Sequence, residues 1–238
     1  MPISYLDVTF ATTNPGKVSE VQAFFDSIPA QDDAPTIRLH CPKHLPDVEE
    51  TETTFLGNAR LKALAAATHA TTPLVMAEDS GFTIPALAGS HGHDSFPGIH
   101  SNRWMTPAIR HELLGMNDGT PVVQAHLSAG IYALLKKNGL DPAKTKATYT
   151  SAWCIANANG QVQLETEGHV KLWLVPEGTP AGHYGFGYDP IVRPCEEELA
   201  GLSVIPHHTL ADIPTDVKNL FSHRGNAMRY VHQWLCTQ

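Results

Sequence analysis

Apolar and polar positions at the start of the chain follow first a strand pattern and then a helix pattern. The segment from Tyr5 to Ala11 is rich in the β-branched and aromatic side chains that favour a pleated strand. It leads into Thr12-Thr13-Asn14-Pro15-Gly16-Lys17, where Asn14 suits a helix N-cap and Pro15 suits the first helical position. The apolar residues that follow recur at helical spacing: Val18, Val21, Phe25 and Ile28. The pattern predicts a strand, a turn and a helix in direct succession.

Further elements of both kinds follow. Residues 36–41 predict a second short strand, and Thr54 can cap the helix that comes after it. Leu74-Val75-Met76-Ala77 is wholly apolar, as expected of a buried central strand, and this run ends abruptly at Glu78. Another helix is predicted to open at Thr120-Pro121, because apolar residues recur behind it at helical spacing: Val123, Leu127, Ile131, Leu134 and Leu135.

The C-terminal half begins with strand patterns. Residues 148–156 and 162–175 predict two strands, with Asn159-Gly160 as a type I′ hairpin turn. A glycine-rich loop follows at residues 179–189, and residues 222–235 predict a closing helix. Strands and helices alternate at both ends of the chain around this β-meander. We therefore predict an α/β protein with two lobes on a shared elongated mixed β-sheet, flanking helices and a central cleft.

Composition and charge narrow the class of protein. A length of 238 residues favours a single domain that spans residues 1–238. The content of 42% hydrophobic residues is enough for a substantial core. The net charge of −8 argues against broad electrostatic binding to nucleic acid. No apolar run approaches the ~18 residues of a membrane span, and the N-terminus lacks the pattern of a signal peptide. We expect a cytoplasmic protein with neither a nucleic-acid nor a membrane partner.

Cysteine and histidine usage does not by itself indicate a metal site. The four cysteines lie far apart without a Cys-x-x-Cys pair, which predicts free or buried thiols in a reducing compartment. The fourteen histidines include His91-Gly92-His93-Asp94 and the pair His207-His208. Their irregular spacing favours a solvated loop over a transition-metal site.

The turn from Thr12 to Lys17 is a candidate phosphate-binding loop. Small residues let backbone amides approach a phosphate, the helix N-terminus adds partial positive charge, and Lys17 adds a full charge. The Gly-x-x-x-x-Gly-Lys-Ser/Thr spacing of a Walker A loop is absent, which disfavours a P-loop kinase. The alternative is an ordinary turn with a lysine exposed to solvent.

Carboxylates gather where the buried strand ends. Glu78-Asp79-Ser80-Gly81 places two charges at a position where burial is costly unless they bind a cation or a reacting water. Because neighbouring strand residues point to opposite faces, only one of the two carboxylates can address a given cleft. Glu49-Glu50 can supply a further oxygen ligand, and such ligands suit Mg²⁺ better than Zn²⁺. The alternative is a solvated acidic turn.

Two later segments are suited to recognising a nucleotide. Gly185-Phe186-Gly187-Tyr188-Asp189-Pro190 combines close backbone access, aromatic rings that stack on a base, and a carboxylate that accepts hydrogen bonds from ring nitrogens. The alternative is a tight loop with both aromatic rings packed inward. The segment from Lys218 to Gly225 brings three potential donors to the start of a helix, where an anionic or carbonyl-bearing ligand would explain them.

The order of these motifs identifies a family. Six of them occur in sequence along the chain: Thr12-Thr13-Asn14-Pro15-Gly16-Lys17, Thr54-Phe55-Leu56-Gly57-Asn58-Ala59, Glu78-Asp79-Ser80-Gly81, Phe96-Pro97-Gly98-Ile99-His100-Ser101-Asn102-Arg103, Gly185-Phe186-Gly187-Tyr188-Asp189-Pro190-Ile191 and Ser222-His223-Arg224-Gly225. Together they resemble the inosine triphosphate/xanthosine triphosphate pyrophosphatases, which remove noncanonical purine nucleotides. The resemblance runs from Val8 to the terminal helix.

This resemblance implies a homodimeric, Mg²⁺-dependent enzyme. The implied reaction hydrolyses noncanonical purine nucleoside triphosphates (ITP, dITP, XTP) between the α- and β-phosphates, to the monophosphate and pyrophosphate. Asp79 is implied to be the catalytic proton acceptor at the metal site, with Glu50 as a metal ligand or water-orienting group. The phosphate loop comprises Thr12, Thr13, Asn14, Pro15, Gly16 and Lys17. The remaining substrate contacts are Ser80, the base-pocket residues Phe186, Gly187, Tyr188 and Asp189, and the nucleotide-binding residues Lys218, His223 and Arg224.

The chain departs from the family pattern at four positions. Thr13 stands in place of a usual glycine, Glu78 in place of a frequent aspartate, and Gly57 in place of a commonly acidic residue. His100 replaces a usual tyrosine. The change at Gly57 puts any metal role at that position in doubt, whereas Asp79 and the His-Arg pair are retained.

Two other functions fit parts of the pattern. A pyrophosphatase acting on pyrimidine or other modified nucleotides would share the phosphate and metal chemistry but lack the His223-Arg224 pair. That pair can donate hydrogen bonds to the 6-carbonyl of hypoxanthine or xanthine and is mismatched against the 6-amino group of adenine. A nucleotide-binding module without turnover is disfavoured by the presence of Asp79 with Glu50.

Overall fold

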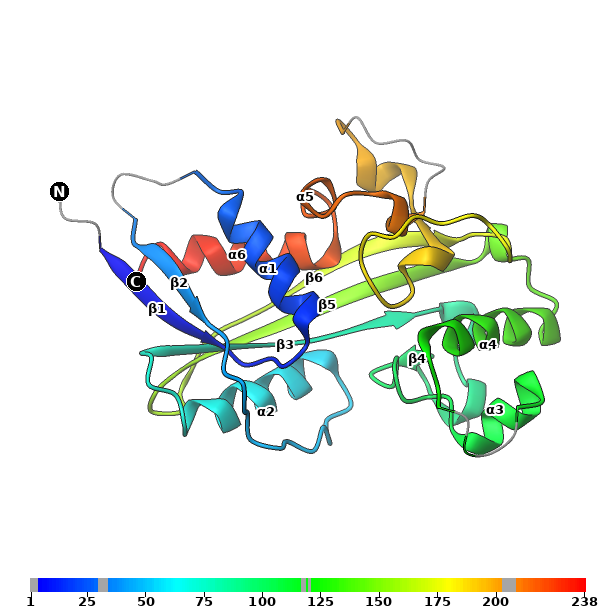
Figure 1. Ribbon diagram of the computed structural model, residues 1–238, viewed down its shortest axis with the longest axis horizontal. Coiled ribbons are helices and arrows are strands. Elements are labelled where there is room, and N and C mark those ends of the chain that lie inside the picture. Colours follow the sequence, from blue (N-terminus) through cyan, green and yellow to red (C-terminus); the bar gives the residue numbers. More distant parts are fainter. Residues whose placement is uncertain (1–3, 30–33, 117–118, 120, 203–208) are drawn as a thin grey trace. The chain divides into compact units, whose positions relative to one another are not determined.

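The computed structural model describes residues 4–29, 34–116, 119, 121–202 and 209–238 (Figure 1). Its helices and strands are β1 (Tyr5–Phe10), α1 (Pro15–Asp26), β2 (Thr36–His40), α2 (Phe55–Ala67), β3 (Leu74–Thr83), β4 (Pro97–Gly98), α3 (Pro107–Leu114), α4 (Gln124–Lys137), β5 (Lys146–Asn157), β6 (Val162–Leu174), β7 (Val192–Pro194), α5 (Thr215–Lys218) and α6 (His223–Leu235). In these described ranges, no helix combines the length and apolar character needed to cross a membrane.

The strands form a mixed sheet, so the predicted α/β class is confirmed. Their order is β2-β1-β3-β5-β6-β7, with β4 paired to β3. Strand β1 runs parallel to β2 and to β3, whereas the β3–β4 and β6–β7 pairs are antiparallel.

The chain divides into two compact units. The first unit comprises residues 1–80, 150–169 and 215–238, and the second comprises residues 81–149 and 170–214. The central cleft expected from the sequence stays a prediction.

Local sequence signals explain where three helices begin. Asn14 caps α1 by accepting hydrogen bonds from the amides of Gly16 and Lys17 at 2.9 and 3.3 Å. Thr54 caps α2 and Ser222 caps α6, each by accepting from the amide three residues further on, at 3.0 and 3.1 Å. Each cap satisfies an amide that has no partner within its helix, so these predicted starts are confirmed.

Two predicted boundaries and one predicted turn type are wrong. Strand β3 does not end at Ala77 but runs through both carboxylates to Thr83. Helix α4 begins at Gln124 and not at Pro121, and Thr120 lies outside the described residues. In the β5–β6 turn only Gly160 is left-handed, with φ of 74°, whereas a type I′ turn needs two such residues. The Asn157 side chain holds this turn by accepting from the amides of residues 159 and 161, both at 3.0 Å.

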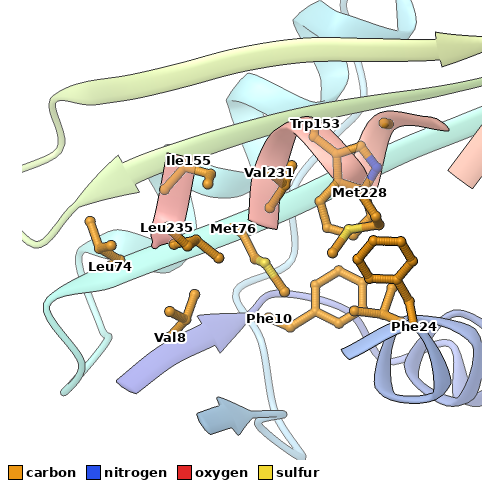
Figure 2. Close-up of a cluster of buried hydrophobic side chains, with 12 residues drawn as sticks. Val8, Phe10, Phe24, Leu74, Met76, Trp153, Ile155, Met228, Val231 and Leu235 are labelled. Atoms are coloured by element: carbon orange, nitrogen blue, oxygen red, sulfur yellow. The ribbon is translucent and has the colours of Figure 1, made fainter. Parts of the chain in front are cut away.

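Helices α1 and α6 cover one face of the sheet in the first unit (Figure 1). The core beneath them contains the large side chains of Phe10, Met76 and Trp153, with Phe10 stacked on Trp153 at 5.2 Å between ring centroids (Figure 2). The other buried members of this core are Val8, Val21, Phe24, Leu74, Ile155, Ala227, Met228, Val231 and Leu235.

Helix α2 covers the opposite face of the same part of the sheet (Figure 1). Here the core consists mostly of alanine, with Val75 and Ala77 of β3 packed among the small side chains of α2. Large and small side chains therefore alternate along β3. Beyond Ala77, each face of the strand presents one of the two carboxylates. Glu78 follows Met76 on the α1–α6 face, and Asp79 follows Ala77 on the α2 face.

The second unit is built around buried aromatic side chains. Tyr188 stacks on Phe82 at 4.7 Å, and Phe82 also contacts Tyr149 at 5.2 Å. Phe96 packs edge-on against Trp104 at 4.9 Å. These contacts fix the loop that contains Tyr188 to the end of β3.

Candidate active site

The predicted phosphate loop lies between β1 and α1 in the first unit. The Asn14 amide donates to Thr12 Oγ1 at 3.2 Å. The Oδ1 atom of Asn14 accepts from the amides of Gly16 and Lys17. Thr13, Asn14 and Pro15 are exposed, so the tip of the loop faces solvent. The Lys17 side chain turns back toward the sheet and pairs with Glu78.

Glu78 is the centre of a buried ionic cluster on the α1–α6 face of β3. Arg224 binds its carboxylate in two places, with Nε to Oε1 at 2.9 Å and Nη2 to Oε2 at 3.2 Å. Lys17 Nζ lies 3.2 Å from Oε2, and Ser151 Oγ donates to Oε1 at 2.5 Å. Arg224 also pairs with Glu20, so one guanidinium joins two carboxylates.

Protonation in this cluster follows from burial and from charge. Burial opposes ionisation of Glu78, but Arg224, Lys17 and Ser151 outweigh it and lower the pKa of Glu78 to about 2. Burial lowers the pKa of Lys17, against the opposing effect of Glu78. Burial and the neighbouring Arg224 lower the pKa of His223 well below its usual value, so its imidazole is neutral at pH 7.

Asp79 belongs to a separate group on the α2 face. Lys62 of α2 donates to Asp79 Oδ1 at 2.8 Å and to Glu50 Oε1 at 3.1 Å. Asn58 lies one helical turn before Lys62. Its side-chain Nδ2 donates to Asp79 Oδ2 at 3.5 Å, and its Oδ1 accepts from the backbone amide of Glu52 at 3.1 Å. Glu50 and Asp79 thus converge on one cation, the Lys62 ammonium.

The donor set of this group fits Mg²⁺. Mg²⁺ prefers hard oxygen ligands and is commonly held by one or two protein carboxylates together with waters and substrate phosphates. Glu50 and Asp79 supply two such carboxylates within hydrogen-bonding distance of one point, the Lys62 ammonium. Across the described parts of the chain, no three His, Cys, Asp or Glu side chains form a fuller metal-binding group.

The start of α2 explains one departure from the family pattern. A Cβ atom on Gly57 would lie 2.7 Å from Glu52 Cβ, closer than van der Waals contact permits. An acidic residue at position 57 is therefore incompatible with the Glu52 backbone position seen here, and Gly57 supplies no oxygen ligand.

The predicted nucleotide-binding residues of the first unit lie at the end of α5 and the start of α6. Lys218 and Arg224 are buried, and Lys218 Nζ lies 3.8 Å from Glu20 Oε1. A Cβ atom on Gly225 would lie 1.9 Å from the Asn219 carbonyl oxygen, so the backbone is packed too closely for any other residue. Ser80 lies on the same side of β3 and accepts from Arg224 Nη2 at 3.4 Å.

The predicted base-pocket residues lie in the second unit and differ in exposure. Phe186 is 39% exposed, whereas Tyr188 is 2% exposed. Tyr188 Oη accepts from Trp104 Nε1 at 2.9 Å and donates to the Ser101 carbonyl at 2.5 Å. Asp189 is buried and accepts from the Phe186 amide at 3.3 Å. Phe186 is thus an exposed ring, whereas Tyr188 anchors the loop from inside.

The histidine-rich segment of the second unit is not a simple solvated loop. His93 lies 4.4 Å from His100 between ring centroids, and His91 stacks on Trp104 at 6.4 Å. The rings therefore extend the aromatic core, which corrects the expectation of a solvated loop. His207 and His208 lie outside the described residues.

Several residues of the site escaped the sequence analysis. Lys62 follows Asn58 by four residues on one helix face, a spacing that could have revealed it. Glu20 follows Lys17 by three residues in the same way. Ser151 carries no local signal, because its role depends on a strand that is distant in sequence. The four cysteines are free, as predicted, and two of them are buried.

Comparison with known proteins finds relatives that match most of the chain. A dITP/XTP pyrophosphatase of Parasynechococcus marenigrum is 32% identical, over 92% of this chain and 90% of the relative. One of Streptomyces coelicolor is 34% identical over 92% of each chain. The solved structure of a HAM1 protein from Coxiella burnetii has a TM-score of 0.71 and 26% identity, and covers 98% of this chain and 100% of its own.

The family profile of the Ham1 family matches residues 8–234, which include every predicted site residue. Because this match covers nearly the whole sequence, the chain belongs to the Ham1 family.

Proposed function

We propose that the protein is a nucleoside-triphosphate pyrophosphatase that hydrolyses dITP, ITP and XTP to the monophosphate and pyrophosphate. The observation that carries the proposal is the convergence of Glu50 and Asp79 on the Lys62 ammonium. Asp79 follows Glu78 in β3, and Glu78 pairs with the Lys17 ammonium. Phosphoryl transfer depends mainly on positioning and charge neutralisation, and these groups supply both. The names of the relatives support the class of substrate.

Glu50 and Asp79 are proposed to hold Mg²⁺, which when bound lowers the pKa of a coordinated water and neutralises phosphate charge. Asp79 accepts the proton of the attacking water at its carboxylate. Lys62, which contacts both carboxylates, keeps them oriented and adds a positive charge. Lys17 and the Thr12–Gly16 loop bind the phosphate chain.

Base recognition is proposed to rest on Phe186, whose exposed ring can stack on a purine. Gly187, Tyr188 and Asp189 shape the loop around it. The prediction that Lys218, His223 and Arg224 contact the nucleotide stays a prediction, and the neutral His223 can donate one hydrogen bond to a 6-carbonyl. A donor facing the 6-amino group of adenine would be left unpaired, at a cost of ~1–3 kcal/mol.

Pyrophosphate release from a panel of nucleotides tests the proposal. We expect dITP, ITP and XTP to exceed ATP by at least about tenfold in kcat/KM, and a chelator to abolish turnover until Mg²⁺ is restored. In ¹⁸O-labelled water the label should enter the monophosphate and not the pyrophosphate. Label in orthophosphate, or equal rates for ATP and ITP, would refute the assignment.

The same assay separates the two alternatives. Preference for a pyrimidine triphosphate would indicate the other class of pyrophosphatase, and nucleotide binding without pyrophosphate release would indicate a binding module. A homodimeric assembly in the cytoplasm is proposed from the family resemblance alone, and sedimentation equilibrium tests the dimer.

A further inference from the structure

The carboxylate of Glu78 lies at the junction of two cations that come from opposite ends of the chain. Lys17 lies in the first turn of α1 and Arg224 in the first turn of α6, yet both contact Oε2 of Glu78 at 3.2 Å, and Arg224 also contacts Oε1 at 2.9 Å. The Glu78 side chain has no exposed surface. A buried carboxylate in this position keeps two neighbouring cations close together, where they would otherwise repel each other.

Ser151 fixes the orientation of this carboxylate. Its hydroxyl donates to Glu78 Oε1 at 2.5 Å and accepts from the indole of Trp153 at 2.8 Å. Trp153 is itself held in the core by its stacking on Phe10. A chain of hydrogen bonds therefore runs from the rigid core through Ser151 to Glu78, and from there to the Lys17 ammonium.

The cluster is separated from the proposed proton acceptor by the strand itself. Glu78 and Asp79 are neighbours in β3 and their side chains point to opposite faces, toward Lys17 and Lys62 respectively. A change at Ser151 can therefore alter the placement of Lys17 while the contacts of Asp79 with Lys62 and Asn58 remain.

We propose that Glu78, oriented by Ser151, is a positioning residue that sets the Lys17 ammonium for binding the phosphate chain of the substrate. This inference rests on the proposed function. Neither Glu78 nor Ser151 is expected to touch the nucleotide, since both are fully buried. Glu78 and Ser151 therefore act on the substrate through Lys17. Changes at these two residues should lower the affinity for phosphate more than they lower kcat.

The mildest test is Ser151→Ala, which removes one hydroxyl and keeps the carboxylate. We expect KM for dITP to rise about fivefold with kcat within about twofold, because ground state and transition state lose the same interaction. The dissociation constant of inorganic tripolyphosphate, measured by calorimetry, should rise by a similar factor. This second measurement does not depend on turnover.

Thr150→Val is the matched control. Thr150 precedes Ser151 on β5, is also buried, at 7% exposure against 0% for Ser151, and its hydroxyl lies on the opposite face of the strand, 3.0 Å from His169 Nδ1. Loss of that hydroxyl should leave KM, kcat and tripolyphosphate affinity within about twofold of wild type, although it also removes a partly buried hydrogen bond. A structural effect common to any buried hydroxyl would move both variants equally.

Glu78→Gln and Glu78→Asp test the carboxylate directly. The glutamine variant keeps the size but loses the charge, and should weaken tripolyphosphate binding at least about twentyfold, beyond the effect of Ser151→Ala. The aspartate variant keeps the charge and should restore most of that loss. If Glu78→Gln does not fold, Ser151→Ala and Glu78→Asp decide the question by the same measurements.

Unchanged tripolyphosphate affinity in Ser151→Ala and Glu78→Gln would overturn the positioning role and leave the proposed function intact. Conversely, Glu78-dependent binding of tripolyphosphate without pyrophosphate release from dITP would support the positioning role and refute the proposed function. Wild-type protein that neither binds tripolyphosphate nor hydrolyses dITP would overturn both.

Discussion

Replacing Arg224 by methionine should lower the free energy of unfolding by about 3–5 kcal/mol, because it removes a cation from a buried ion network and leaves the buried carboxylates behind. The Arg224 side chain is 2% exposed and bonds Glu78 twice, Glu20 and Ser80. Methionine keeps much of the aliphatic volume, but Glu78 loses both hydrogen bonds from Arg224 and keeps its contacts with Lys17 and Ser151. Domains are typically stable by about 5–15 kcal/mol, so the loss is a large part of the total. Urea unfolding followed by circular dichroism measures it, with an unchanged m-value expected.

Arg60→Met is the matched control for this experiment. Arg60 pairs with Glu165 through two hydrogen bonds of 2.6 and 2.8 Å, but its side chain is 51% exposed. Water already solvates both ions, so the expected loss is below about 1 kcal/mol. Adding Glu20→Gln to Arg224→Met should recover part of the loss, because it neutralises a carboxylate that has lost its guanidinium partner. Equal losses in the two methionine variants, or no recovery in the double variant, would refute the reasoning.

Three further outcomes follow from the same structure. Asp79→Asn should lower kcat about 10²–10⁴-fold with the fold retained by circular dichroism, and near wild-type turnover would place the base elsewhere. Burial lowers the pKa of Lys17 and Glu78 opposes that shift, so kcat/KM should fall as alkaline pH neutralises Lys17. Glu78→Gln should move this limb of the pH profile to lower pH, and an unmoved limb would contradict the pairing. Tyr188→Phe should cost about 1–3 kcal/mol in chemical unfolding, since Trp104 Nε1 and the Ser101 carbonyl lose a buried partner.

Much of the first unit could be predicted because its signals are local. Asn14, Thr54 and Ser222 cap their helices through amides two or three residues away, so neighbouring residues contain the information. The same holds for the apolar start of β3 and for the glycine-rich loop of the second unit. The sequence also offered Glu50 as a partner of Asp79, because Glu50 precedes the predicted helix α2 and Asp79 follows the apolar start of β3.

The interior of the Glu78 cluster could not be predicted in this way. A hydropathy pattern predicts that a buried strand ends at a carboxylate. Strand β3 continues past Glu78 because three distant segments supply its partners Lys17, Ser151 and Arg224. Such partners are close only after folding. For the same reason Arg224 appeared from sequence only as a ligand donor, whereas the structure gives it a network of buried ion pairs.

The side-chain sizes along β3 did contain one signal that assigns the two carboxylates to their faces. Leu74 and Met76 are large and face the aromatic core under α1 and α6, whereas Val75 and Ala77 are small and face the alanines of α2. With a period of two residues, Glu78 continues the face of the large side chains and Asp79 the face of the small ones. Small side chains let α2 approach closely, which is what brings a helix-borne lysine within 2.8 Å of Asp79. The alternation of size therefore separates a carboxylate that organises cations in the core from one that can take part in the chemistry.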